Sequence, residues 1–162
     1  GALNRVVGGW EVTSFGRMTS GRPFTVWAGT NTVSNVNQST ANCTNCRRGD
    51  GTPFLDGPSG LIWYFDAAQR ARLSAPGAGE FGTLGRNFFV GPHYFVLNTS
   101  LLKRIPLTER VRLELRADAT NATNSVMFNA PTADITSSIF GRIRNSTHSE
   151  SRKIQLAAKI HF

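Results

Sequence analysis

The sequence predicts an all-β fold, in which about four antiparallel, up-and-down strands form an arc of a transmembrane β-barrel with two long extracellular loops. Three observations support this prediction. The clearest segments alternate apolar and polar residues, long and short connections alternate between them, and the final residue, Phe162, is apolar. A strand with lipid on one side and a wet lumen on the other has this two-residue period.

The composition excludes several other classes of protein. The 162 residues are enough for one domain with a core, and the sequence has no run of about 18 apolar residues that would predict a transmembrane helix. The net charge is +8, but the arginines are spread along the chain without a run or a nucleic-acid motif. We therefore expect no nucleic-acid partner.

The first predicted strand runs from Gly8 to Ser20 and, after a break at Gly21-Arg22-Pro23, continues to about Ala28. One face carries Trp10, Val12, Ser14, Gly16 and Met18, and the other carries Glu11, Thr13, Phe15 and Arg17. The alternation is imperfect, but residues that favour strands dominate.

A long excursion follows, from Thr30 to about Asn87. Residues 31–60 are rich in Asn, Ser, Thr, Gly and Pro, which is typical of loops, and residues 62–71 predict an aromatic anchor with one or two helical turns. Trp63, Arg86 and Asn87 are the candidate loop residues for contact with a ligand. Arg86 and Asn87 fit equally well as a hydrogen-bonding anchor where the loop rejoins the barrel. We expect these loops to be poorly ordered in the isolated arc.

The next two strands are predicted at His93–Lys103 and Arg110–Asn121, with a short turn at Ile105–Glu109. The second strand sorts its apolar residues to one side and places four charged residues, predicted to face the lumen, on the other: Arg112, Glu114, Arg116 and Asp118. These charges fit either a wall that contacts substrate or a lattice of cross-strand salt bridges. The lattice is favoured, because such rows are usually solvated.

A second polar excursion over residues 121–151 leads to the final strand, Arg152–Phe162. Its apolar face carries Ile154, Leu156, Ala158, Ile160 and Phe162. Because barrels of this kind have short periplasmic turns and long outer loops, the turn near Pro106 is predicted to be periplasmic. Four strands are too few to close a membrane barrel, whose smallest members have about eight. We therefore expect residues 1–162 to be the C-terminal part of a longer chain.

The two cysteines, Cys43 and Cys46, lie in a polar, turn-rich stretch. A small local disulfide, formed in an oxidising compartment, is the expected state, and two free thiols are the alternative. No metal site is expected, because the three histidines form no second ligand pair. No catalytic or cofactor-binding site is expected either, since neither Ser20 nor Ser100 lies in a Gly-x-Ser-x-Gly elbow. We therefore expect that this chain is not an enzyme.

Several short stretches, in order, resemble the C-terminal end of TonB-dependent outer-membrane receptors. They include Val7–Val12, Ser20–Phe24, Trp63–Ala68, Gly82–Asn87, Leu97–Lys103, Leu107–Arg110, Arg116–Asn124, Phe140–Ile143 and Arg152–Phe162. The resemblance is to the Oar-like branch, whose N-terminus carries a carboxypeptidase-regulatory-like domain. The chain departs from that pattern at Asn98, where an Asp is common, and at Cys43 and Cys46, which are not a feature of the family.

The resemblance implies a barrel of about 22 strands with an N-terminal plug, embedded in outer-membrane lipid and energised by TonB through an N-terminal region absent from these residues. It also implies that the final strand, Ile154 to Phe162, is the signal read by the barrel-assembly machinery. The implied function is binding and TonB-energised uptake of a small ligand, such as a ferric chelate or an oligosaccharide. The alternatives are a non-transport or adhesive outer-membrane barrel, and a soluble basic β-domain that binds polyanions.

Overall fold

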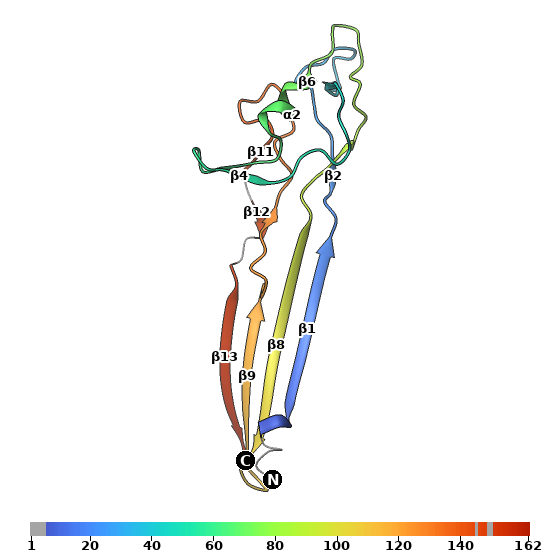
Figure 1. The fold of residues 1–162 in the computed structure, drawn as a ribbon. Coiled ribbons are helices and arrows are strands. Elements are labelled where there is room, and N and C mark those ends of the chain that lie inside the picture. The colour runs from blue at the N-terminus through green and yellow to red at the C-terminus, as the bar shows by residue number, and fades with distance from the viewer. Residues whose placement is uncertain (1–5, 145, 149–150) are drawn as a thin grey trace. The chain divides into compact units, whose positions relative to one another are not determined.

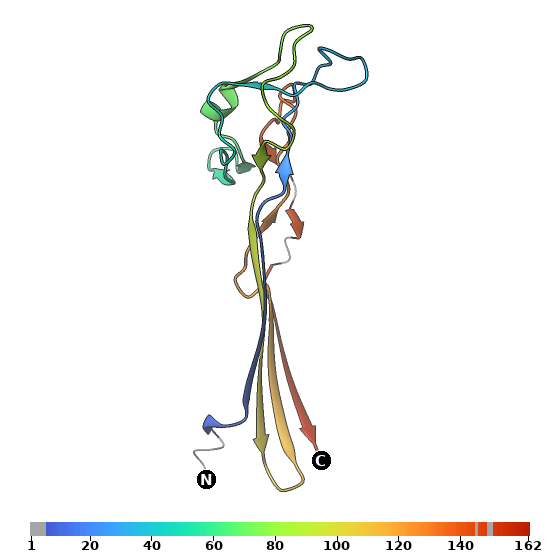
Figure 2. The ribbon, with the colours of Figure 1, turned by 90° about the vertical axis from the view of Figure 1, so that its right-hand side faces the viewer.

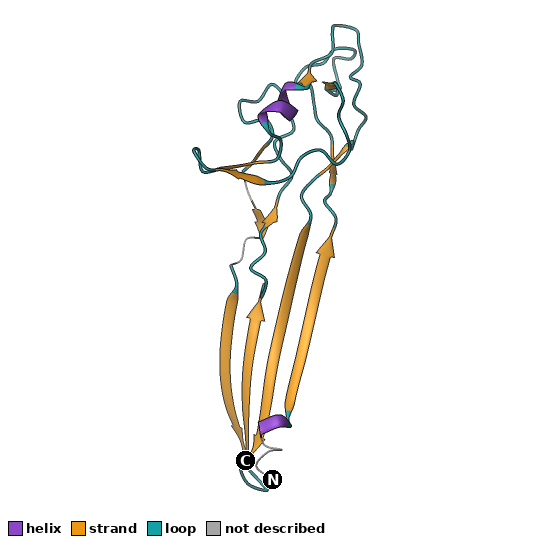
Figure 3. Cartoon of the chain, in the orientation of Figure 1, coloured by secondary structure: helices purple, strands orange, loops and turns teal. Residues whose placement is uncertain are grey.

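The computed structural model describes residues 6–144, 146–148 and 151–162, and almost all of its regular structure is antiparallel strand (Figures 1 and 3). The chain divides into two compact units, which are described separately. The first comprises Gly1–Met18, Phe95–Val126 and Ser149–Phe162, and the second comprises Thr19–Tyr94 and Met127–His148. The predicted all-β, antiparallel fold class is confirmed.

The first unit is built on a four-stranded sheet with the order β1-β8-β9-β13 (Figure 1). Its strands are β1 (Trp10–Thr19), β8 (Tyr94–Pro106), β9 (Arg112–Thr120) and β13 (Lys153–His161). Neighbouring strands run in opposite directions, as Figure 1 shows, and β1 and β13 are the two edges, which Figure 2 also shows. Four predicted strands are therefore present in the expected chain order.

The turn between β8 and β9 lies slightly later than predicted. Strand β8 continues through Pro106, which is the register partner of Arg112. The reversal is made by Leu107 and Thr108, whose N–H groups donate to the carbonyl of Val111 at 3.0 and 3.1 Å. The predicted turn at Ile105–Glu109 began too early, because a proline can end a ladder without breaking the strand before it.

Register sorts the residues of the sheet onto two faces. In both antiparallel pairs, directly opposed residues point to the same side. The apolar face has the pairs Ile154 with Ala119, Leu156 with Ala117, Ala158 with Leu115, and Ile160 with Leu113. The charged face has Gln155 with Asp118, Ala157 with Arg116, Lys159 with Glu114, and His161 with Arg112. A shift of one residue would exchange the two faces, so this alternation fixes the register.

The second unit consists of short strands joined by turns (Figure 3). They are β2 (Pro23–Phe24), β3 (Asn42–Cys43), β4 (Phe54–Asp56), β5 (Leu61–Trp63), β6 (Leu73–Ser74), β7 (Phe89–Val90), β10 (Met127–Phe128), β11 (Arg142–Ile143) and β12 (Ser146–His148). The strands pair as β11-β5-β4, β2-β7, β3-β6 and β10-β12. One short helix, α2 (Ala67–Ala71), begins at Asp66, whose carboxylate accepts the Gln69 N–H at 2.7 Å. This helix confirms the helical turns predicted within residues 62–71.

The predicted continuation of the first strand to Ala28 is interrupted. Strand β1 ends at Thr19, and only the two residues of β2 and an isolated bridge at Trp27 follow it. At this break the backbone of Gly21 lies against that of Gly91, since a Cβ atom on residue 21 would lie 1.6 Å from the carbonyl oxygen of Gly91. The two backbones can approach this closely only because residue 21 is glycine.

The loop segments fold around a core of aromatic side chains. Phe65 and Phe89 are each 1% exposed, and their ring centroids lie 5.1 Å apart. Phe24, Tyr64 and Phe140 pack against Phe65 at centroid distances between 5.2 and 6.1 Å. The expectation of poorly ordered loops is therefore wrong for the described residues. The polar composition of the loops concealed single aromatic residues, far apart in sequence, that together bury a core.

Within the described ranges, no helix is long and apolar enough to cross a membrane.

Candidate functional site

A row of ionic and polar side chains crosses all four strands on the charged face of the sheet. The Arg104 guanidinium of β8 lies 3.0 Å from the Glu11 carboxylate of β1 and 3.5 Å from the Glu114 carboxylate of β9. The same Glu114 oxygen lies 3.9 Å from Nε2 of His161 on β13. Both arginine pairs are partly exposed, so each contributes about 0.2–1 kcal/mol at most. The row therefore fixes side-chain positions on a wet surface more than it stabilises the fold.

The four charged residues predicted to face the lumen all lie on this face. Besides Glu114, Arg116 contacts Asp118 at 2.9 Å, and Asp118 accepts a hydrogen bond from Ser100 on β8. Arg112 lies opposite His161. Of the four residues, only Glu114 forms ion pairs with neighbouring strands in the part of the chain that the structure describes, whereas the Arg116–Asp118 pair lies within β9, so the contacts agree with the predicted cross-strand lattice only in part. Sequence reasoning missed Glu11 and Arg104, although continuing the alternation of β8 past Lys103 would have placed Arg104 on the charged face.

A buried lysine lies on the apolar face near the start of β1. Lys103 is only 6% exposed, and its register partner is Leu115. Its ammonium group donates to the carbonyls of Val6, at 2.8 Å, and Gly8, and it lies 4.7 Å from the centre of the Trp10 ring. These acceptors offset the cost of placing a cation among apolar residues. The sequence analysis did not identify this cluster. The alternation of β8 could have indicated it, because Lys103 falls among the apolar residues of one strand face.

The rest of the apolar face is exposed or half-buried. Large apolar side chains at 38% to 80% exposure project from all four strands, namely Trp10, Val12, Met18, Phe95, Leu101, Leu115, Ile154, Leu156 and Ile160. The residues predicted as the assembly signal, Ile154, Leu156, Ala158 and Ile160, share this face on the edge strand β13, and Phe162 follows the strand fully exposed. Soluble monomers rarely expose so continuous an apolar surface, which points to an apolar surrounding.

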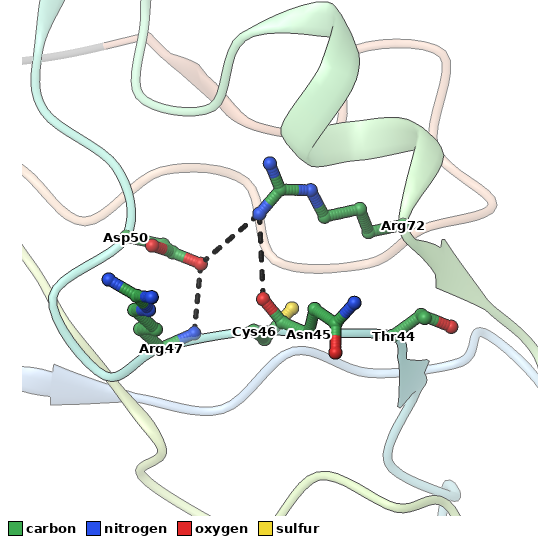
Figure 4. A pocket seen from close by; sticks show the side chains of 6 residues that line it. All are labelled: Thr44, Asn45, Cys46, Arg47, Asp50 and Arg72. Carbon is green, nitrogen blue, oxygen red and sulfur yellow. Dashed lines mark hydrogen bonds and ion pairs between the residues drawn. The ribbon is translucent and has the colours of Figure 1, made fainter.

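The second unit contains a polar pocket of about 840 Å³, which we call the Arg72 pocket (Figure 4). It is lined by Thr44, Asn45, Cys46, Arg47, Asp50 and Arg72. One terminal nitrogen of Arg72 lies 3.8 Å from the Asp50 carboxylate and 3.5 Å from the Asn45 carbonyl oxygen. The same carboxylate accepts the backbone N–H of Arg47 at 2.8 Å. Figure 4 shows both guanidinium groups with nitrogens that no dashed line engages.

Several short-range links hold the walls of the Arg72 pocket. A disulfide joins Cys43 to Cys46, with their Cα atoms 5.9 Å apart. Between them, Asn45 has a positive φ of 56°, a conformation that asparagine tolerates better than most residues. The Thr44 N–H donates to the Arg72 carbonyl at 3.1 Å, which ties the two sides together. Such a fixed, open, polar pocket can bind a hydroxylated or anionic ligand through guanidinium and amide donors.

The predicted loop residues do not line this pocket. Trp63 belongs to β5, and the guanidinium carbon of Arg70 lies 4.1 Å from its ring centre. Arg86 lies over the Trp27 ring at 5.7 Å. Asn87 has a φ of 56°, and its N–H donates to the Thr25 hydroxyl at 2.9 Å. These contacts favour the anchor interpretation of Arg86 and Asn87 over a binding-loop tip.

Two ionisable groups of the second unit have shifted pKa values. Burial raises the pKa of Tyr64, whose hydroxyl donates to the carbonyl of Val90. The hydroxyl of Thr136, which donates to Asp134 at 2.7 Å, lowers the pKa of that carboxyl, and a backbone N–H of Thr136 and the side chain of Gln38 also contribute. Both groups are held by structural hydrogen bonds. Among the described residues, no group of three or more His, Cys, Asp or Glu side chains could hold a metal ion.

Comparison with known proteins identifies the family of this chain. Residues 1–155 match the family model described as an outer membrane beta barrel domain. Neither a curated protein nor a solved structure gives a significant match. The family model covers nearly the whole chain, and the two-faced antiparallel sheet agrees with it. The chain therefore belongs to the outer membrane beta barrel domain family, whose place is the bacterial outer membrane.

Proposed function

We propose that this chain is the C-terminal part of the barrel of a TonB-dependent receptor of the Oar-like branch, which binds a small ligand and imports it. The observation that carries the proposal is the folding of the long loops around their own aromatic core. Loops that only join strands need no such core, whereas a loop unit with a fixed polar pocket of about 840 Å³ has the form of a binding site.

The sheet has a distinct part in this proposal. Its apolar face contacts outer-membrane lipid, and its charged face lines the lumen. Its two edge strands, β1 and β13, pair with further strands of the same receptor, since unpaired backbone groups in lipid cost several kcal/mol each. The short turn at residues 107–111 is periplasmic, and the loop unit is extracellular. The segment has no catalytic role in this scheme.

Strand β13 also serves assembly in this proposal. Its apolar residues and Phe162 are the signal that the barrel-assembly machinery reads, an assignment that the exposed edge of β13 supports. Deleting Phe162 from the full-length protein should lower the membrane-inserted, heat-modifiable fraction on gels. Deleting a loop residue of similar size, Phe81, which is 80% exposed, is the matched control. Equal insertion of both deletion variants would contradict the assignment.

The uptake step is tested in cells that carry the full-length gene. Accumulation of labelled ferric chelates and oligosaccharides is compared with and without TonB. We expect at least one of these ligands to accumulate only when TonB is present, and Arg72→Gln to reduce that accumulation more than Arg86→Gln does. Accumulation that is unchanged by loss of TonB would contradict energised transport.

A second candidate is a barrel whose loops bind a macromolecular partner without transport. One observation favours it, namely that the second unit exposes large apolar side chains, with Val36, Leu55 and Phe81 between 67% and 85% exposed. Binding of the receptor to a cell surface that is abolished by Leu55→Ser and Phe81→Ser, without any TonB-dependent uptake, would favour this alternative. The family match speaks against the soluble polyanion-binding alternative.

A further inference from the structure

A second, smaller pocket lies in the loop unit, beside helix α2. It has a volume of about 350 Å³ and is formed by residues of α2 and of the segment 135–140. Arg70, Ser137 and Ser138 supply its polar groups, and the remaining lining is apolar and includes Ile135 and Phe140. We call it the Arg70 pocket. Its size is at the lower end of the range for ligand sites, which limits the ligand to a small molecule or one side chain.

The guanidinium of Arg70 is oriented by an aromatic ring. Its central carbon lies 4.1 Å from the centre of the Trp63 ring, so the guanidinium packs against the tryptophan in a cation–π contact. The backbone of Gly141, whose φ is 79°, lies beside this arginine, since a Cβ atom on residue 141 would be in contact with Arg70 Cδ at 3.4 Å. A stacked guanidinium still has its N–H donors in the plane of the group, at its edge. This edge geometry suits a planar carboxylate.

The positive charge around Trp63 is not compensated by the described residues. Arg142 is the register partner of Trp63 on the neighbouring strand β11, although it does not line the pocket. The Nε atoms of Arg70 and Arg142 are both buried without a hydrogen-bond partner. No carboxylate among the described residues forms an ion pair with either arginine. A buried guanidinium nitrogen without a partner is unfavourable, so an anion that accepts a hydrogen bond from Arg70 would lower the free energy of the site.

The other lining groups define the rest of the ligand. The hydroxyl oxygen of Ser137 accepts the N–H of Ile139 at 3.4 Å, which leaves its O–H hydrogen available to an oxyanion. Most of the pocket surface is polar, and its smaller apolar part, which includes Ile135 and Phe140, suits a short hydrocarbon group attached to the carboxylate, which inorganic anions lack. We propose that the Arg70 pocket binds a small organic carboxylate with a short apolar group, either a free acid or the C-terminal residue of a peptide. The proposal does not depend on TonB coupling or on the Arg72 pocket.

The test is ligand-observed NMR on the full-length receptor in nanodiscs. The probes are isobutyrate, isobutylamine, inorganic phosphate, and a short peptide that ends in Val with a free or an amidated C-terminus. We expect isobutyrate to bind, and isobutylamine and phosphate to bind at least tenfold more weakly. A peptide acid that binds more tightly than isobutyrate, with no binding of its amide, would identify a peptide C-terminus as the source, and binding of isobutyrate alone would identify free acids.

Matched variants locate the binding. Arg70→Gln should weaken binding of isobutyrate at least tenfold and Ser137→Ala about threefold, whereas Arg86→Gln, which removes the arginine that lies over Trp27 outside both pockets, should leave it unchanged. Ser137→Ala keeps the test valid if Arg70→Gln disturbs folding, which the heat-modifiable fraction reports. Absence of isobutyrate binding, equal binding of isobutylamine, or equal affinity of the Arg70→Gln, Ser137→Ala and parent proteins would overturn the proposal.

Discussion

An arginine placed on the apolar face of β13 should change the free energy of unfolding by a different amount from an arginine placed on its charged face. Leu156 is 77% exposed on the apolar face, and Gln155, its neighbour in sequence, lies on the charged face opposite Asp118. The substitutions Leu156→Arg and Gln155→Arg introduce the same side chain at adjacent positions of the same strand. Any difference between the two variants therefore reports the surroundings of the two faces.

The magnitude follows from the position of the residue along the strand. The nine residues of β13 extend about 31 Å at about 3.4 Å per residue, or about 24 Å across the membrane at a tilt of about 40°. This matches the apolar band of such barrels, which is about 25 Å tall. Leu156 lies one residue from the centre of the strand, so an arginine there should cost about 2–4 kcal/mol. Arginine at position 155 should cost less than about 0.5 kcal/mol, because it faces Asp118 on a wet surface.

The assay is urea unfolding of the full-length receptor in lipid vesicles, followed by tryptophan fluorescence. We expect Leu156→Arg to lower the free energy of unfolding by about 2–4 kcal/mol and Gln155→Arg to leave it nearly unchanged. Expression and heat modifiability should show the same order. Equal losses for the two variants, or a larger loss for Gln155→Arg, would refute the assignment of the apolar face to lipid.

Other predictions concern single clusters of the two units. Lys103→Met should lower the unfolding free energy by about 1–3 kcal/mol, because two carbonyl acceptors lose their donor. A variant as stable as the parent would show that these hydrogen bonds do not stabilise the fold. Replacing Cys43 and Cys46 by Ser should destabilise the loop unit by about 2 kcal/mol, because the disulfide closes a very short loop. Hydrogen exchange of the loop amides measures this loss, and unchanged exchange would argue against a role of the disulfide in holding the Arg72 pocket. Phe65→Ala should cost about 3–5 kcal/mol in the same unit, and full protease resistance of that variant would contradict the aromatic core. The ionised carboxylate of Asp134 should stabilise the loops at pH values above its ordinary pKa of about 3.9. This stabilisation should be lost as the pH falls through the lower pKa that the carboxyl has in the folded state. In limited proteolysis, Asp134→Asn should make the protease resistance of the loops less dependent on acid pH, and an unchanged pH profile would contradict this role.

The sheet was predictable from sequence because the alternation of apolar and polar residues can be recognised within each single strand. The period of two in Arg110–Asn121 assigns each residue to a face without knowledge of its partners, and apart from Lys103, which pairs with Leu115, the register then brings the apolar residues of neighbouring strands to one face. The position of the turn was less predictable, since Pro106 fits either a strand end or a turn. The role of Asn98 was also not predictable, because it depends on a residue of another strand end. Its side-chain oxygen accepts the N–H of Asn121 at 2.9 Å, and an Asp could accept the same hydrogen bond.

The loop unit was not predictable in the same way, because its contacts join residues far apart in the chain. Phe24 packs against Phe65 and Phe89, and no periodic pattern marks these three residues. The Arg72 pocket likewise depends on pairing between β3 and β6, which are two residues long. Both arise from tertiary packing, which outweighs local propensity in short segments. The pairing of Cys43 with Cys46 needed only the sequence, since the two residues are three positions apart.

The most direct test of the membrane account is a cysteine scan along β9 in the full-length receptor in outer membranes. Single cysteines replace each residue from Arg112 to Ala119, a segment that the structure places in the middle of the sheet. The account predicts strict alternation: fluorophores at 113, 115, 117 and 119 are quenched by brominated lipid, and cysteines at 112, 114, 116 and 118 react with an aqueous thiol reagent. Uniform reaction with the aqueous reagent, or quenching without a period of two, would contradict it.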